Sequence, residues 1–219
     1  MERRELAIFD LDDTLISGQS HKWLMLFLRR KKLFSFAEYL SLFAWFFLYK
    51  ARIVNNVETV MEKAYKFLKD HTREEINSLL EEFFDNDLKK RFYDKTINII
   101  NNSRKHGQQT LLLSNAPKIL LNIIAGHLGI DYYIGTEVEE KNGIYTGKIL
   151  KFMYGAKRVD EITQFCDRRN ILLKDCFLYT DHYSDIPLLK IVGQPVAVNP
   201  DSKLAAFAKK MNFPIIITQ

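Results

Sequence analysis

Short apolar runs bounded by turn residues alternate with longer stretches of helical periodicity over most of the chain. This alternation is typical of a parallel β-sheet that is flanked by helices. The runs that we interpret as strands are residues 6–9, 110–113, 132–134, 176–179, 196–198 and 215–217. The sequence therefore predicts an α/β fold with a parallel-sheet core.

Two segments depart from that alternation. Residues 138–149 alternate around Asn142-Gly143, and an Asn-Gly pair in such a place favours a β-hairpin. Residues 17–85 contain no convincing strand and read as three or four helices. We predict a core made of residues 1–16 and 87–219, with a helical domain inserted at residues 17–86 that covers it as a cap.

Composition narrows the class of protein. The 219 residues are enough for one α/β domain with an inserted subdomain. The net charge of +5 is compatible with phosphate esters, nucleic acid or acidic membrane surfaces as partners. Cys166 and Cys176 lack metal-type spacing, so we expect reduced thiols rather than a bridge. The N-terminus lacks the features of a signal peptide, and we expect a cytoplasmic location.

Three carboxylates directly follow the first predicted strand: Asp10, Asp12 and Asp13. The C-terminal ends of parallel strands border the crevice in which α/β proteins bind ligands, so Asp10 and Asp12 are expected to face one pocket. Because like charges repel, such a cluster needs a cation, and hard oxygen ligands around a phosphate suit Mg²⁺. The alternative is a solvated turn with an aspartate cap for the next helix.

A second pair of carboxylates, Asp181 and Asp185, follows the strand at 176–179. Asp181 stands where a metal ligand would be presented, and Asp185 could reach the same site. A pair after each of two strands favours a metal site over two helix caps. His21 and His182 could carry protons, but a lone histidine is more often a surface or packing residue, and we assign neither to catalysis.

The strand at 110–113 ends in Ser114 and Asn115, just before Pro117 opens a helix. A hydroxyl and backbone N–H groups at a helix N-terminus could hold phosphate oxygens, although a plain N-cap explains the pattern equally well. Lys157, in the first turns of a later helix, could neutralise phosphate charge. An isolated lysine on a helix is more often a solvated surface residue.

Together these segments resemble the haloacid dehalogenase-like phosphatase superfamily. The resemblance rests on D-x-D-x-T at 10–14, Ser114 at a strand end, Lys157, and D-x-x-x-D at 181–185, in the family's order over nearly the whole chain. It implies a Rossmann-like core, and the helical insertion is similar to the cap of phosphoserine phosphatases. Residues 134–137, 143–147, 183–189 and 196–200 resemble subfamily IB, and within it the phosphatidylglycerophosphatase C and CicA-like group.

The resemblance implies a phosphoryl transfer to Asp10. In that reaction Asp10 attacks phosphorus in line, and Mg²⁺ is held by Asp10, Asp181 and the backbone carbonyl of Asp12. Asp12 also protonates the leaving alcohol and later activates water against the aspartyl-phosphate.

The remaining roles follow from the same resemblance. Ser114, Asn115 and Lys157 are expected to bind the phosphate oxygens, and Asp185 to orient the water around the metal.

Two departures from phosphoserine phosphatases concern the substrate. Those enzymes carry a carboxylate nine residues beyond the nucleophile, suited to an ammonium group, whereas this chain has Gln19. They also follow the motif serine with two glycines, whereas Asn115 and Ala116 stand here. We expect Gln19 and His21 to influence substrate specificity, and phosphoserine is disfavoured as the main substrate.

Residues 33–49 are rich in aromatics and flanked by basic residues. We favour their packing as a lid in the cap, with contact at the inner face of an anionic membrane as the alternative. Nucleic acid is not expected, because no aromatic-interleaved binding motif accompanies the basic residues.

The sequence thus predicts an Mg²⁺-dependent phosphomonoesterase that acts through an aspartyl-phosphate. The leading substrate hypothesis is a glycerophospholipid-type phosphate, such as phosphatidylglycerophosphate or a lysophosphatidate. One alternative is a small soluble ester, phosphoserine-like or histidinol-phosphate-like. The other is a catalytically silent binding protein that uses the cap surface, which would have no need for clustered carboxylates.

Overall fold

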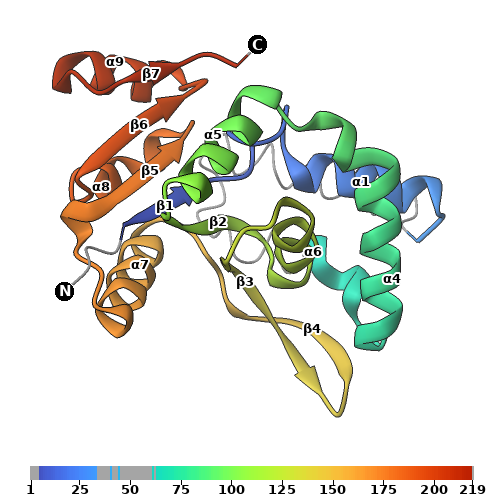
Figure 1. Ribbon diagram of the computed structural model, residues 1–219. Helices are drawn as coiled ribbons and strands as arrows, with labels where there is room; N and C mark the ends of the chain where they lie inside the picture. The colour runs from blue at the N-terminus through green and yellow to red at the C-terminus, as the bar shows by residue number, and fades with distance from the viewer. Residues whose placement is uncertain (1–4, 34–39, 41–43, 45–60, 62, 219) are drawn as a thin grey trace.

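The core of the computed structural model is a seven-stranded sheet with the order β4-β3-β2-β1-β5-β6-β7 (Figure 1). The structure describes residues 5–33, 40, 44, 61 and 63–218. β4 (Ile144–Lys151) runs antiparallel to β3, and every other neighbouring pair is parallel. The parallel strands are β1 (Leu6–Phe9), β2 (Gln109–Pro117), β3 (Tyr132–Lys141), β5 (Cys176–Thr180), β6 (Gln194–Val198) and β7 (Ile215–Ile216). Each of the six predicted strands overlaps one of these, which confirms the predicted fold class.

Helices cover both faces of the sheet, and this explains why β1 is apolar throughout. Ala7 and Phe9 belong to one hydrophobic cluster, and Leu6 and Ile8 to another on the opposite face. A strand that is buried on both faces reads as a continuous apolar run. Side chains of α5 (Asp94–Lys105) and α6 (Lys118–Leu128) join the first cluster. The second contains side chains of α7 (Ala156–Arg169), α8 (Ile186–Leu189) and α9 (Ser202–Met211).

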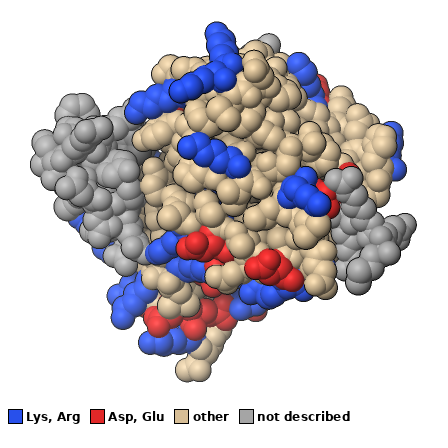
Figure 2. Space-filling model, turned by 90° about the vertical axis from the view of Figure 1, so that its left-hand side faces the viewer, with Lys and Arg blue, Asp and Glu red and all other residues tan. Residues whose placement is uncertain are grey.

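The face formed by α7 to α9 is turned toward the viewer in Figure 2. Its Lys and Arg side chains are for the most part separated by uncharged surface or lie beside Asp and Glu. This face does not present the continuous basic stripe that is typical of nucleic-acid-binding domains.

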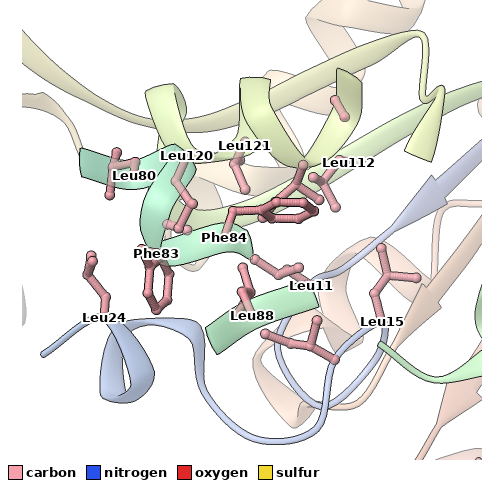
Figure 3. Close-up of a cluster of buried hydrophobic side chains, with 14 of the residues drawn as sticks. Leu11, Leu15, Leu24, Leu80, Phe83, Phe84, Leu88, Leu112, Leu120 and Leu121 are labelled. Atoms are coloured by element: carbon pink, nitrogen blue, oxygen red, sulfur yellow. The ribbon is translucent and has the colours of Figure 1, made fainter. Parts of the chain in front are cut away.

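Between β1 and α5 the chain forms a helical insertion. Its described part contains α1 (Ser20–Arg30), α4 (Arg73–Phe83) and three short helices, η1 (Tyr65–Leu68), η2 (Phe84–Leu88) and η3 (Lys89–Arg91). Apolar side chains of the insertion pack against the loop after β1, β2 and α6 (Figure 3). The labelled members are Leu11, Leu15, Leu24, Leu80, Phe83, Phe84, Leu88, Leu112, Leu120 and Leu121. The insertion therefore shares one hydrophobic cluster with the sheet.

The two segments that connect the insertion to the core lie beside each other. The backbone N–H of Ser17 donates to the carbonyl of Arg91 over 2.9 Å, and that of Tyr93 donates to the carbonyl of Leu15 over 2.9 Å. The Arg91 guanidinium lies 3.3 Å from the centre of the Trp23 ring, a cation–π contact between the two segments. The chain therefore enters and leaves the insertion at neighbouring positions.

The predicted hairpin is present as β3 and β4. Asn142 and Gly143 both have positive φ, 52° and 81°, as a type I′ turn requires. The hairpin also contacts the insertion: the N–H of Asp70 donates to the carbonyl of Tyr145, and the N–H of Tyr145 to the carbonyl of His71, both over 2.9 Å. These backbone bonds join the hairpin to the segment that follows η1.

Three further expectations concern cysteines and membranes. Cys166 and Cys176 are free and buried, with Sγ atoms 3.7 Å apart. Most of residues 33–49 lie outside the described residues, so the choice between a lid and a membrane contact stays a prediction. Within the described part of the chain, no helix combines the length and apolarity needed to cross a bilayer.

Candidate active site

Side chains from three adjacent strands meet at one edge of the sheet. Asp10 follows β1, Asp181 follows β5, and Ser114 lies near the end of β2; they are 6%, 8% and 1% exposed. β1 pairs in parallel with both β2 and β5, so the C-terminal ends of these strands border the same crevice. The structure therefore brings together the three strand-end residues that the sequence singled out.

Asp10 is held by its backbone and by a cation. Its N–H donates to the carbonyl of Tyr179 over 2.9 Å, and the rings of Phe9 and Tyr179 stack with centroids 4.8 Å apart. One carboxylate oxygen of Asp10 accepts from Nη2 of Arg158 over 2.6 Å. The backbone of Asp10 is therefore held by β5, and its carboxylate is held by Arg158.

Arg158, and not Lys157, is the cation that the structure places at the site. Arg158 is 6% exposed, and its Nη1 lies 3.1 Å from Oδ1 of Asp185, whereas Lys157 is exposed. The buried side chains of α7 are Arg158, Ile162, Phe165 and Cys166. That spacing is one helix face, so the helical phase of the sequence could have identified Arg158. We therefore correct the expectation for Lys157.

Asp185 closes the other side of the Arg158 guanidinium. It lies in η5 (Tyr183–Asp185), is 2% exposed, and accepts from the Thr180 hydroxyl over 2.6 Å. In the described structure Asp185 contacts Arg158 and Thr180, and the contact with Arg158 holds the guanidinium in place.

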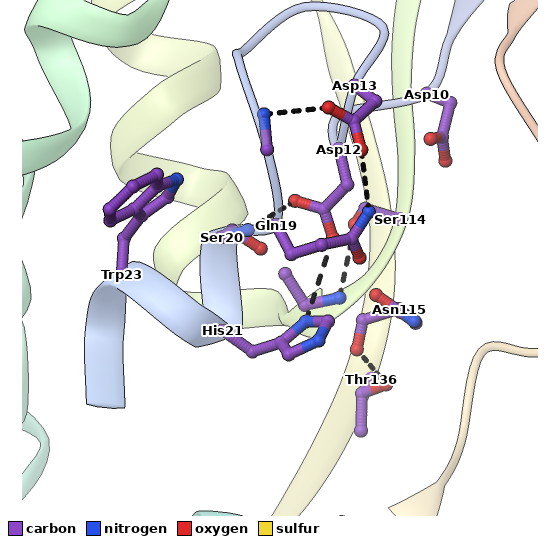
Figure 4. A network of polar contacts seen from close by, with 12 residues as sticks. Asp10, Asp12, Asp13, Gln19, Ser20, His21, Trp23, Ser114, Asn115 and Thr136 are labelled. Carbon is purple, nitrogen blue, oxygen red and sulfur yellow. Dashed lines mark hydrogen bonds and ion pairs between the residues drawn. The ribbon is translucent and has the colours of Figure 1, made fainter. Parts of the chain in front are cut away.

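The N-terminus of α1 is placed on the carboxylates that follow β1 (Figure 4). The N–H of Ser20 donates to Oδ1 of Asp12 over 2.6 Å, and Nδ1 of His21 lies 3.7 Å from Oδ2 of Asp12. The side-chain amide of Gln19 donates to Oδ2 of Asp13 over 3.0 Å. Gln19 and His21 thus lie beside the catalytic candidates, where the two were expected to act on specificity.

A further residue of the insertion, Tyr65, reaches the turn after Ser114. Its hydroxyl donates to the carbonyl of Asn115 over 3.0 Å, and the hydroxyl of Thr136 donates to the same oxygen over 2.7 Å. Burial and the nearby Asp12 raise the pKa of Tyr65, so its hydroxyl remains a donor. Sequence reasoning missed Tyr65, because an aromatic residue within a helical insertion is usually a packing residue.

Burial and mutual repulsion raise the pKa values of the carboxylates. Burial raises the pKa of Asp10 to about 7 although Arg158 opposes the change. Burial and the charge of Asp10 raise the pKa of Asp181 to about 10. Burial also raises the pKa of Asp12, against the opposing effects of His21 and the Ser20 N–H. One arginine does not neutralise the cluster, so the site favours a further cation.

The donor chemistry fits a hard divalent ion. Asp10 and Asp181 offer two buried carboxylates, which is the ligand type that Mg²⁺ prefers. Among the described residues no three His, Cys, Asp or Glu side chains form a ready-made metal cage. A backbone carbonyl, water and substrate oxygens would supply the other ligands of such an ion.

The arrangement is suited to covalent phosphoryl transfer, in which a carboxylate oxygen attacks phosphorus. A buried carboxylate beside a guanidinium is a nucleophile with its anion-binding group already in place. Asp12 supplies a second carboxylate of raised pKa, which suits a general acid and base. Ser114 supplies a buried hydroxyl for an oxyanion.

Comparisons with known proteins agree with this chemistry. A phosphoserine phosphatase, SerB1, of Mycobacterium tuberculosis strain H37Rv is 30% identical over 213 residues, which cover 95% of this chain and 69% of that protein. A histidinol-phosphatase of Neisseria meningitidis serogroup C is 27% identical over 219 residues, covering 97% and 98%.

Solved structures and a family match complete the comparison. A Bordetella pertussis protein of unknown function superposes with a TM-score of 0.89 at 25% identity over 98% of both chains. A phospho-aspartyl intermediate analogue of phosphoserine phosphatase has a TM-score of 0.68 at 18% identity, covering 100% and 95%, which shows a shared fold. Residues 7–190 match the haloacid dehalogenase-like hydrolases. The chain belongs to the haloacid dehalogenase-like hydrolase family.

Proposed function

We propose that this hydrolase is an Mg²⁺-dependent phosphomonoesterase that forms an aspartyl-phosphate on Asp10. The observation that carries the proposal is the buried contact of Asp10 with Arg158 at a strand edge shared with Asp181 and Ser114. A nucleophile, an acid–base candidate and an anion-binding group lie within one site, as phosphoryl transfer requires.

In the first half-reaction, a carboxylate oxygen of Asp10 forms a bond to phosphorus while the bond to the ester oxygen breaks. Asp12 donates its proton to the departing alcohol. In the second half-reaction, Asp12 takes a proton from water, whose oxygen attacks phosphorus and releases Asp10 and inorganic phosphate. The raised pKa of Asp12 supports its role as the proton donor.

Charge on the transferred phosphoryl group requires neutralisation throughout. Arg158 supplies a positive charge beside Asp10, and Ser114 and Asn115, in the last part of β2, supply a hydroxyl and amide groups. Mg²⁺, held by Asp10, Asp181 and the backbone carbonyl of Asp12, would add positive charge against the phosphoryl oxygens. Asp185 would keep Arg158 in place and would orient the water around the ion.

For the substrate, we propose a small soluble phosphate ester. Two similar proteins carry the names phosphoserine phosphatase and histidinol-phosphatase, and these names support a soluble ester better than the glycerophospholipid hypothesis. Gln19 hydrogen-bonds to Asp13, and His21 lies beside Asp12. We propose that both side chains contact the alcohol portion of the substrate. The membrane contact and the inner-membrane location rest on residues 33–49 and have no further support.

We also propose that residues 17–86 act as a cap over a core of residues 1–16 and 87–219. Contacts of Ser20 with Asp12 and of Tyr65 with Asn115 support this division, because both residues approach the site from the insertion. A closed cap would exclude bulk water while Asp10 is phosphorylated and admit only the water that Asp12 activates.

The first experiment is hydrolysis of p-nitrophenyl phosphate with and without Mg²⁺ by the wild type, Asp10→Asn and Asp160→Asn. Asp160 is an exposed aspartate of α7 and serves as the matched control. Metal-dependent turnover that Asp10→Asn alone abolishes supports the proposal. Failure of the wild type both to hydrolyse the ester and to bind beryllium fluoride with Mg²⁺ would favour the binding-protein alternative.

The substrate class is tested next by comparing kcat/KM for phosphoserine, histidinol phosphate and a lysophosphatidate. A preference for either soluble ester supports the proposal. A preference for the lipid ester, together with sedimentation on anionic vesicles, would restore the membrane reading.

A further inference from the structure

The peptide unit that joins Asn115 to Ala116 lies between the insertion and the phosphate-binding candidate Ser114. Its carbonyl oxygen accepts hydrogen bonds from the hydroxyls of Tyr65 and Thr136. Its N–H, on Ala116, donates to the hydroxyl oxygen of Ser114 over 3.2 Å. A trans peptide is planar, with its C=O and N–H on opposite sides. Any donor that fixes the carbonyl therefore also fixes the direction of the N–H.

The N–H bond determines what the Ser114 hydroxyl can do. A serine oxygen that accepts a hydrogen bond still has its own proton to donate. Ser114 is 1% exposed, and the described structure gives its hydroxyl the Ala116 N–H as a donor. The proton of the Ser114 hydroxyl therefore remains available for donation to a phosphoryl oxygen.

Of the two hydroxyls that hold the carbonyl, one depends on the insertion. Thr136 belongs to β3 and stays with the sheet, whereas Tyr65 belongs to η1. Tyr65 is 1% exposed, and its ring is part of the cluster that joins the insertion to the core. The segment after η1 is bonded to Tyr145 of the hairpin. The hydrophobic cluster and the hairpin therefore both help to hold Tyr65 in position.

We infer that Tyr65 is a positioning residue through which the insertion orients Ser114, by way of the Asn115–Ala116 peptide. The inference rests on the proposed phosphatase function. Binding of the insertion against the core supplies the second hydrogen bond to the Asn115 carbonyl and completes the phosphate-binding turn.

A double-mutant cycle tests this coupling with p-nitrophenyl phosphate and Mg²⁺. Tyr65→Phe keeps the ring and removes one neutral hydrogen bond, so we expect kcat/KM to fall by about threefold to tenfold. Ser114→Ala removes an oxyanion donor and lowers kcat by about a hundredfold. In the Ser114→Ala background, Tyr65→Phe is expected to change kcat/KM by less than about twofold, because the group it orients is gone.

Tyr145→Phe is the matched control, since it removes a hydroxyl from the same interface at a distance from Ser114. It should retain wild-type kcat/KM, and all variants should unfold near the wild-type Tm. An unchanged Tyr65→Phe enzyme, or an equal loss in both Ser114 backgrounds, would overturn the role of Tyr65 while Asp10-dependent turnover still upheld the proposed function. An inactive wild type would instead reject the proposed function.

Discussion

At the scale of single residues, Arg158 is the side chain on which the chemistry of Asp10 depends most directly. We expect Arg158→Ala to lower kcat/KM by about a hundredfold or more. The substitution removes the positive charge from the phosphoryl group and leaves two buried carboxylates, Asp10 and Asp185, without their partner. Steady-state hydrolysis of p-nitrophenyl phosphate with saturating Mg²⁺ measures the effect.

Lys157→Ala, one position away, provides the comparison. Because Lys157 is exposed, we expect its removal to change kcat/KM by less than about twofold, as surface substitutions usually do. Arg158→Lys keeps the charge and loses the forked contact, so its activity should fall between wild type and Arg158→Ala. A larger loss for Lys157→Ala than for Arg158→Ala would reverse the assignment.

The aspartates and Ser114 could be predicted because each follows an apolar strand, and strand ends meet at one edge. Arg158, and not its neighbour Lys157, lies beside Asp10. Adjacent helical residues point about 100° apart, so the choice between the two depends on where the helix begins. Tyr65 could not be predicted, since its hydrogen bond to Asn115 joins residues fifty positions apart. Such contacts depend on tertiary packing.

At the scale of secondary structure, α4 has a capping box at its N-terminus. The Thr72 hydroxyl accepts from the N–H of Glu75 over 3.2 Å, and the Glu75 carboxylate accepts from the N–H of Thr72 over 2.8 Å. We expect Thr72→Ala to lower the free energy of unfolding by about 1 kcal/mol, measured by urea denaturation. Ser78→Ala, on the exposed face of the same helix, is the control and should be neutral or slightly stabilising.

The Glu75 carboxylate adds a pH dependence to that helix. The backbone hydrogen bond from Thr72 holds the pKa of Glu75 below its usual value. A depressed folded-state pKa contributes stability above the ordinary pKa of 4.5 and loses it as the pH falls through the folded value. The difference in stability between wild type and Glu75→Gln should therefore shrink on acidification from about pH 6, and a constant difference would contradict the capping role.

Elements were predicted best where the apolar run is short and bounded. β1 was predicted at its observed limits, and the Asn142-Gly143 turn placed the hairpin. β2 continues past Leu113 through Ser114 to Pro117, and the sequence did not show this because the polar residues Ser114 and Asn115 interrupt the apolar pattern. The π-helix η2 could not be predicted either, because its apolar residues continue the helical spacing of α4.

For the whole molecule, the carboxylate cluster links metal binding to stability. Asp10 and Asp181 have folded-state pKa values raised to about 7 and about 10. The folded state without metal thus binds protons that the unfolded state has released, and its stability falls as the pH rises through this range. Mg²⁺ replaces those protons, so we expect it to raise Tm more at about pH 8 than at about pH 6.

Thermal unfolding with Mg²⁺ or with chelator at both pH values measures this difference. Asp181→Asn removes one ligand charge and should abolish most of the Mg²⁺ effect at either pH. An equal Mg²⁺ effect at both pH values in the wild type would show that the ion does not displace protons from the cluster.

The order of the motifs was enough to predict the overall architecture, because a strand followed by a long helical stretch and then by alternating strands and helices leaves few arrangements of the sheet. The contacts between the insertion and the core could not be predicted from the sequence. The backbone pairing of Asp70 and His71 with Tyr145 involves no side-chain signal at all.

The paired connections at Ser17 and Arg91 bear on how such enzymes diversify. Because the chain leaves the core and returns to it at neighbouring positions, the intervening piece can grow, shrink or be exchanged without displacing a strand. The entropic cost of closing a longer loop rises only with the logarithm of its length. Recombination of one contiguous stretch of gene can therefore change the part that we propose meets the alcohol, while the strand ends that carry Asp10, Ser114 and Asp181 keep their places.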